Sequence, residues 1–211
     1  MIHPHTKVLN LDNNRGSGVF ATQFIPKGTL VWVPSEIDQI LSKEQVSTMA
    51  KSEREFLAEV AYLTNEGKYI VSYDNARYVN HSCDANSLTV VGIEISIAIR
   101  DIQPNEEISE DYGLYYSNEG FECICGSSKC RHKICEDDVQ QHGNEWDSKV
   151  TSVFHLILKV EQPLWQVLHF TKKEQIEAIL DGKICFPSCK ILKCSPEYLQ
   201  TAGELLWPSS I

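Results

Sequence analysis

The sequence predicts a mainly β protein with some α-helix, and three observations support this fold class. Short runs of β-branched and aromatic residues separated by Gly and Pro turns fill the first part of the chain, as in VFATQF at 19–24 and TLVWVP at 29–34. A cysteine-rich segment follows at 121–135. Beyond it, apolar residues recur at helical spacing. The 211-residue chain therefore divides into a β-rich part, a cysteine segment and a helical tail.

One stretch within the β-rich part has a different pattern. Residues 42–65, SKEQVSTMAKSEREFLAEVAYLTN, carry apolar side chains at helical spacing, with Ser42 as a candidate N-cap and Gln45 three residues later. This pattern predicts a single inserted helix that ends near Gly67. Strands are predicted on both sides of it, within residues 6–35, 68–83 and 88–99.

The tail is predicted to contain several helices. The apolar pattern over 144–170 is interrupted at Pro163, which indicates two helices because proline breaks the backbone hydrogen-bond ladder. KKEQIEAIL at 172–180 predicts a further short helix, and SPEYLQTAGELL at 195–206 predicts a last one.

Composition limits the function classes. No apolar run is long enough to cross a bilayer, and no secretory signal precedes the first strand, so we expect a soluble, intracellular protein with reduced thiols and no membrane partner. The formal net charge of −10 argues against direct binding to nucleic acid phosphates. It is compatible with a basic partner, and also with the general acidity of many cytosolic proteins. Composition does not distinguish cytoplasm from nucleus.

The cysteine segment, FECICGSSKCRHKIC, is typical of a zinc site. Cys123, Cys125 and Cys130 have the spacing C-x-C-x4-C and offer three of the four thiolates that tetrahedral zinc prefers. Within the segment, His132 and Cys135 are candidates for the fourth ligand, and other candidates are distant in sequence. Three more cysteines are expected to be free thiols, with a second zinc site as the alternative: Cys185, Cys189 and Cys194.

Three separated stretches resemble one enzyme family. RGSGVFATQFIPKGT at 15–29, RYVNHSCDAN at 77–86 and EISEDYG at 107–113 occur in the order used by SET-domain lysine methyltransferases, and FECICGSSKCR resembles their post-SET zinc segment. The resemblance implies a SET fold of small curved sheets with a pseudoknot that brings NHSC against DYG. It implies a catalytic domain at 6–113 with a variable insert at about 36–68, a post-SET segment at 119–135 and a helical extension at 136–211.

The resemblance also implies the roles of individual residues. Tyr112 corresponds to the catalytic tyrosine, whose hydroxyl orients the lysine amine. S-adenosylmethionine is expected to contact the glycine turn and the NHSC stretch, which supply Arg15, Gly16, Ser17, Gly18, Val19, Asn80 and His81. The substrate lysine channel is expected to involve Glu110, Tyr115 and Tyr116.

Two positions depart from the family pattern. Glu110 stands two residues before Tyr112, where the family commonly has Phe or Tyr. Its carboxylate is expected either to lie near the lysine channel or to point outward and hold a basic substrate residue. Trp32 lies where the usual glycine-glutamate-tyrosine pattern is missing, and is expected either in a channel or cofactor wall or in the core.

The resemblance redirects the choice of the fourth zinc ligand. It implies Cys83, the last residue of NHSC, so that Cys83, Cys123, Cys125 and Cys130 would form a closed Zn²⁺ site. The cysteine segment would then cover the active site.

These observations predict a protein-lysine N-methyltransferase that uses S-adenosylmethionine and acts on a lysine in a basic segment of a histone or another protein. The alternative is a catalytically silent SET-like module that binds a basic protein partner, which Glu110 keeps open. The sequence does not reveal the substrate, the number of methyl groups added or the oligomeric state.

Overall fold

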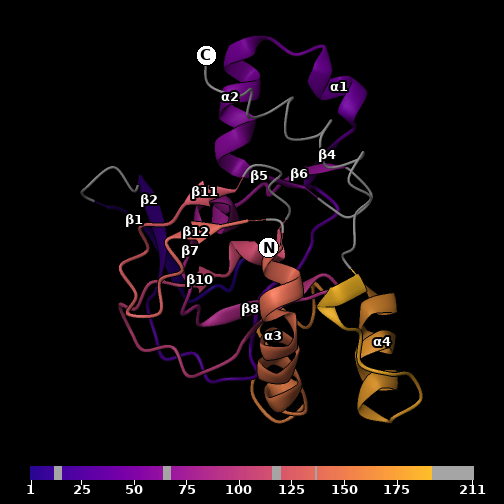
Figure 1. Ribbon diagram of the computed structural model, residues 1–211. Coiled ribbons are helices and arrows are strands. Elements are labelled where there is room, and N and C mark those ends of the chain that lie inside the picture. The colour runs from indigo at the N-terminus through magenta and orange to yellow at the C-terminus, as the bar shows by residue number, and fades with distance from the viewer. Residues whose placement is uncertain (12–15, 64–67, 116–119, 136, 192–211) are drawn as a thin grey trace.

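The computed structural model describes residues 1–11, 16–63, 68–115, 120–135 and 137–191 (Figure 1). This part of the chain is built from small sheets with helices at opposite ends of the molecule, α1 and α2 at one end and α3 and α4 at the other. The predicted mainly β fold with some helix is confirmed. No helix within the described residues is long and apolar enough to cross a bilayer.

The described strands form two- and three-stranded sheets. The first is an antiparallel pair of β1 (Thr6–Asn10) and β2 (Ser17–Ala21). A three-stranded sheet has the order β3-β9-β8, from Leu30–Trp32, Ile95–Ala98 and Ser87–Val90. A second three-stranded sheet has the order β4-β6-β5, from Gln39–Leu41, Tyr69–Val71 and Ala61–Leu63.

A short parallel pair joins two segments that are far apart in the sequence. Strand β7 (Asn80–His81) lies beside β10 (Ser109–Glu110), with Asn80 opposite Ser109 and His81 opposite Glu110. NHSC is therefore placed against EISEDYG, as the resemblance implied. The cysteine segment contributes the remaining pair, β11 (Phe121–Glu122) with β12 (Lys133–Ile134).

The inserted segment differs from its prediction. The single helix expected over 42–65 is wrong: α1 (Lys43–Ser47) and α2 (Lys51–Val60) are separate, and the chain then enters β5. The Ser42 cap is confirmed, because the Ser42 hydroxyl accepts from the Gln45 backbone N–H at 3.3 Å. A second helix start arises at extended Ala50, whose N–H donates to the Glu53 carboxylate at 2.8 Å.

The tail also differs in part. Helix α3 (Asp138–Phe154) begins earlier than the pattern indicated, and α4 (Phe170–Leu180) confirms the short helix predicted at 172–180. The helix expected after Pro163 is wrong, since residues 164–168 form turns. Gln162 ties this region to the sheet: its side-chain oxygen accepts from Leu30 N–H at 2.8 Å and its amide donates to the Gly28 carbonyl at 2.8 Å. The helix predicted at 195–206 lies outside the described residues.

The tail packs on the β-rich part through a shared core. Gly28 adopts φ +88°, and a Cβ there would lie 2.4 Å from the Leu156 Cβ, so the approach of these two segments requires glycine. The largest buried cluster combines strands β3, β8 and β9 with α3 and α4, and includes Leu30, Leu88, Ile95, Ile97, Trp146, Val150, Phe154, Ile157 and Ile176.

Candidate active site and metal cluster

Tyr112 begins a short 3-10 turn, η2 (Tyr112–Leu114), directly after β10. Its hydroxyl donates to the Val79 carbonyl at 2.5 Å, and its backbone N–H donates to Nδ1 of His81 at 3.0 Å. Burial, with the nearby Glu110 carboxylate as a second cause, raises the pKa of Tyr112 above its ordinary value. The phenol therefore stays neutral with its proton committed to Val79, and its oxygen lone pairs remain to accept a hydrogen bond.

A continuous row of aromatic rings extends from Tyr112. Tyr115 lies 5.7 Å from Tyr112 between ring centroids, Tyr62 lies 5.8 Å from Tyr115, and Trp32 lies 5.9 Å from Tyr62. On the other side, the Phe121 ring lies 6.2 Å from Tyr112. We call these five residues the aromatic row; such rings form an apolar wall whose faces attract cations.

Sequence reasoning missed Tyr62 and Phe121. Tyr62 lay inside the predicted helix, whereas it belongs to β5, where it reaches Trp32 and Tyr115. The β-favouring side chain of Tyr62 was the available signal. Trp32 packs against the core cluster around Val19 and Ile25, as one of its two expected roles required, and its role in a channel or cofactor wall stays a prediction.

Other tyrosines lie elsewhere. Tyr78 packs against the same core cluster, and Tyr73 is substantially exposed. Tyr116 lies outside the described residues.

Glu110 is buried beneath the aromatic row. Its side chain accepts hydrogen bonds from the hydroxyls of Tyr115 at 2.7 Å, Thr89 at 3.1 Å and Ser87 at 3.2 Å, and only 4% of the residue is exposed. The outward orientation considered from the sequence is therefore wrong. The carboxyl group fixes the Tyr115 hydroxyl instead of meeting solvent. Burial raises the pKa of Glu110 although these hydroxyl donors oppose the effect.

We expect Glu110→Gln to remove a pH dependence of stability. Because burial raises the folded-state pKa of Glu110, its contribution to folding is fully present below the ordinary carboxyl pKa of about 4.3 and is lost as pH rises through the folded value. The variant should therefore gain stability relative to wild type as pH rises above about 4.3 and through the raised folded-state pKa. Denaturant unfolding across this range measures the difference; Glu36→Gln, at an exposed site, should follow wild type. Parallel profiles for wild type and Glu110→Gln would contradict the assignment.

The glycine turn lies beside Asn80. The Asn80 amide donates to the Ser17 carbonyl at 2.9 Å and to the Glu107 carboxylate at 2.8 Å. A Cβ at Gly18 would lie 2.7 Å from that carboxylate, so a side chain at this position would displace the Glu107 carboxylate from its present place. Gly16, at φ +68°, faces open space. The structure thus brings the turn and NHSC together and leaves the backbone accessible at Gly16, which fits a ligand that contacts main-chain groups.

For two of the residues expected to contact the cofactor, Val19 and Arg15, the structure does not confirm a side-chain contact with a ligand. The Val19 side chain is fully buried in the core, so it contacts no ligand and only its main chain is available. Arg15 lies outside the described residues.

Sulfur atoms from two distant segments converge beside Tyr112. The ligand atoms of His81, Cys83, Cys123 and Cys125 all lie within 4.8 Å of one another, and Cys130 packs on the same cluster. The Sγ atoms of Cys83 and Cys123 are 3.7 Å apart. Tetrahedral zinc with Zn–S bonds of about 2.3 Å places its sulfurs about 3.8 Å apart, so this spacing fits the metal.

Backbone and ring donors surround these sulfurs. Arg131 N–H donates to Cys83 Sγ at 3.3 Å and His132 N–H donates to Cys130 Sγ at 3.4 Å. Burial raises the pKa of the Cys83 thiol. Burial also opposes ionisation of Cys125, but hydrogen bonds from the backbone of Cys83 and Ser127 outweigh it and lower its pKa to about 7. This environment favours thiolates once a cation is present.

His81 is positioned as a support for the cluster. Nδ1 of His81 accepts the Tyr112 N–H, so the ring proton sits on Nε2 and points at Cys83 Sγ, 3.3 Å away. The ring therefore has no free lone pair for a metal. Of the two local alternatives, the Cys135 thiol contacts the Asp138 carboxylate at 3.4 Å and His132 is exposed, and neither belongs to the converging group. That group contains Cys83, Cys123 and Cys125 of the predicted ligands, and Cys130 as the fourth ligand stays a prediction.

The later cysteines do not form a comparable group. Cys185 is exposed and Cys189 is buried, while Cys194 lies outside the described residues. Among the residues that the structure describes, the cluster at Cys83 is the one place where potential metal ligands converge in this way.

Comparison with known proteins agrees with this geometry. Residues 16–113 match the SET domain family model. Histone-lysine N-methyltransferase Set2 of Drosophila melanogaster is 27% identical over 64% of this chain and 6% of its own length, and histone-lysine N-methyltransferase EHMT1 of Mus musculus is 31% identical over 56% and 10%. Histone-lysine N-methyltransferase SET9 of Gibberella zeae is 27% identical over 65% of this chain and 20% of its own length. The chain thus spans a small part of these relatives.

Two solved structures are also similar to the chain. The methyltransferase domain of human histone-lysine N-methyltransferase SETMAR is 22% identical with a TM-score of 0.44, over 64% of this chain and 58% of that one. KRYPTONITE in complex with mCHG DNA and SAH is 19% identical with a TM-score of 0.45, over 61% and 28%. These scores are too low to support an argument about the site. The match to the family model identifies residues 16–113 of this chain as a SET domain, and within these residues the structure pairs the NHSC strand with the strand that precedes DYG.

Proposed function

We propose that this protein transfers a methyl group from S-adenosylmethionine to a lysine side chain. The observation that carries the proposal is the placement of Tyr112. Its ring is part of the aromatic row, its hydroxyl donates to the Val79 carbonyl, and the strand just before it pairs with NHSC. The curated relatives are named as histone-lysine N-methyltransferases, which supports the same reaction.

The residues present suit the chemical requirement of this transfer. A free lysine has a pKa of about 10.4, so losing its proton at pH 7 costs roughly 4 to 5 kcal/mol. Exclusion of water by the aromatic row disfavours the ammonium form through desolvation, and the attraction of the ring faces for cations offsets part of this effect. The Tyr112 oxygen, with its own proton committed to Val79, can accept a hydrogen bond from the amine and so aim the nitrogen lone pair.

The cofactor would lie along the glycine turn and NHSC. Gly16, Ser17, Gly18, Asn80 and His81 are the residues in position to hold it, with Arg15 added from the sequence. Bound S-adenosylmethionine would supply the methyl group as part of a sulfonium cation, which also disfavours a neighbouring ammonium.

Zinc would be held by Cys83, Cys123, Cys125 and Cys130 in a purely structural role. Four thiolates close the coordination shell and leave no position for water, so a zinc-dependent hydrolase is not supported. The metal would tie the post-SET segment at 119–135 to NHSC of the catalytic domain at 6–113.

The substrate is proposed to be a basic segment of a histone or another protein. The formal net charge of −10 favours the approach of such a segment. Absence of direct nucleic acid binding stays a prediction from this charge.

Radiolabelled transfer tests the proposal directly. We expect the protein, incubated with methyl-labelled S-adenosylmethionine and a panel of basic proteins, to label at least one of them on lysine. Cofactor binding without transfer to any member of a broad panel would support the silent binding module instead, which the unusual Glu110 makes the second candidate.

We expect Tyr62→Ala to weaken substrate binding. Removing a central ring of the aromatic row opens the wall beside Tyr115, so KM for a substrate peptide should rise about tenfold, the effect of losing one aromatic anchor. Affinity for S-adenosylmethionine should stay within about twofold of wild type. Tyr73→Ala, at an exposed site outside the row, is the control and should leave KM unchanged. An unchanged KM for Tyr62→Ala would show that Tyr62 does not contact the substrate.

A further inference from the structure

Asp111 is a buried hub next to the proposed catalytic tyrosine. Only 2% of the residue is exposed. Its carboxylate accepts hydrogen bonds from both terminal nitrogens of Arg131 at 2.6 and 2.7 Å, from Trp146 Nε1 at 3.1 Å and from Gly113 N–H at 3.0 Å. The Gly113 contact closes the turn that presents Tyr112. Asp111, the residue before Tyr112, therefore joins its own turn to the cysteine segment through Arg131 and to helix α3 through Trp146.

Arg131 connects this hub to the sulfur cluster. Its backbone N–H donates to Cys83 Sγ, while its guanidinium forms the two-pronged contact with Asp111 and lies 3.2 Å from the Asp138 carboxylate. A two-pronged arginine-carboxylate contact fixes orientation as well as distance. The guanidinium also lies 5.7 Å from the Trp146 ring centre.

Helix α3 carries two of the residues around Asp111 and Arg131, namely Asp138 and Trp146. Asp138 and Trp146 are both buried on this helix, and a Cβ on Gly113 would lie 2.8 Å from the Trp146 ring and 3.0 Å from Asp138. The helix thus presses against the turn of Tyr112, although it lies beyond the SET match at 16–113.

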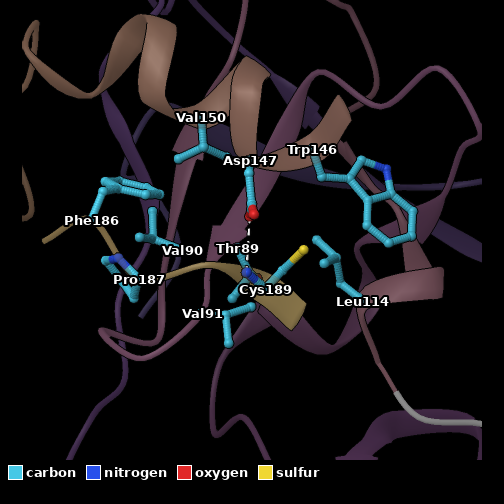
Figure 2. A pocket seen from close by; sticks show the side chains of 10 residues that line it. All are labelled: Thr89, Val90, Val91, Leu114, Trp146, Asp147, Val150, Phe186, Pro187 and Cys189. Atoms are coloured by element: carbon cyan, nitrogen blue, oxygen red, sulfur yellow. Dashed lines mark hydrogen bonds between the residues drawn. The ribbon is translucent and has the colours of Figure 1, made fainter. Parts of the chain in front are cut away.

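Helix α3 is itself held in place. Asp147, one residue after Trp146, accepts a hydrogen bond from Cys189 N–H at 2.8 Å (Figure 2). It also accepts one from the Ser188 hydroxyl at 2.5 Å. The adjoining cavity, between α3, β8 and the 186–189 segment, has only about 10 Å³, roughly the space of one water. A cavity of this size, at the interface between α3 and the 186–189 segment, is too small for a ligand larger than water.

We propose that Arg131 and Trp146, with Asp138 as the second carboxylate partner of Arg131, form a clasp on Asp111 through which helix α3 positions Tyr112 for catalysis. These are positioning residues, and the inference rests on the proposed methyl transfer. A buried ion pair adds little to stability compared with apolar packing. The clasp instead determines the orientation of the turn that carries the tyrosine hydroxyl, to which transfer is sensitive.

Trp146→Phe separates positioning from packing. The variant keeps an aromatic ring on α3 and removes the N–H that bonds Asp111. We expect kcat to fall about tenfold, with KM for peptide and affinity for S-adenosylmethionine within about twofold of wild type. Hydrogen exchange in residues 109–115 should become faster. Arg131→Lys, which keeps the charge and loses the two-pronged contact, should change kcat in the same direction.

The matched control is Trp165→Phe, on the same extension, where the ring packs near Lys173 and away from Asp111. It should keep wild-type kcat and exchange in residues 109–115. The proposal is overturned if Trp146→Phe retains wild-type kcat and exchange, or if both variants lose kcat equally. If the wild-type protein transfers no methyl group, the proposed function fails, and the exchange comparison still decides whether the clasp orders the Tyr112 turn.

Discussion

Replacing Tyr112 with Phe is expected to lower the rate of methyl transfer at least about 100-fold. The ring and its packing against Tyr115 and Phe121 would remain. The variant lacks the hydroxyl oxygen proposed to accept a hydrogen bond from the lysine amine, and it leaves the Val79 carbonyl without its 2.5 Å partner. Affinity for S-adenosylmethionine should stay within about twofold of wild type, because the proposed cofactor contacts lie at the glycine turn and NHSC.

Single-turnover transfer to a labelled substrate measures this loss, and titration with S-adenosylmethionine measures cofactor affinity. Tyr78→Phe is a matched control, since Tyr78 packs against the core cluster and lies outside the aromatic row. It should keep wild-type turnover. Wild-type turnover of Tyr112→Phe would show that the hydroxyl does not orient the amine.

Replacing Cys83 with Ser is expected to reduce bound zinc and methyl transfer together. Cys83 is the proposed ligand that comes from NHSC, so its loss disconnects the cysteine segment from the catalytic domain. Zinc content should fall from about one equivalent to well below half, and transfer should fall at least about tenfold, because metal binding and local folding are coupled. Prolonged chelation of the wild-type protein should reproduce both effects.

Cys135→Ser is the matched control for this substitution. The Cys135 thiol contacts Asp138 and lies apart from the sulfur cluster. Zinc content and transfer should therefore stay close to wild type. Full zinc retention in Cys83→Ser, or zinc loss in Cys135→Ser, would return the site to a ligand set within the cysteine segment.

Local patterns predicted several elements because the relevant forces act between neighbours in sequence. The Ser42 cap and helix α4 follow from such contacts, and the structure has both. The pattern over 42–65 misled because it could not show that Glu53 starts a second helix or that Tyr62 joins a strand. The pairing of β5 with β6, which is a contact between different segments, overrides the local helical preference.

The burial of Glu110 could not be read from its position in the sequence. A glutamate is usually exposed unless its oxygens find partners. Its partners Ser87 and Thr89 are on β8, more than twenty positions earlier in the chain, and their approach depends on the packing of β10. An outward-pointing Glu110 side chain was therefore compatible with its neighbours in the sequence, but the contacts between distant segments bury it.

The sequence by itself determined the family, through RGSG, NHSC, DYG and C-x-C-x4-C, because glycine turns and metal ligands are chemical requirements that particular residue types meet. It also determined which residues are available for chemistry, Tyr112 and the cysteines among them. Only the tertiary structure decided that Tyr62 extends the aromatic row, that Glu110 is buried and that Arg131 and Trp146 meet at Asp111. These contacts join residues far apart in the chain, and their geometry depends on how all the intervening elements pack.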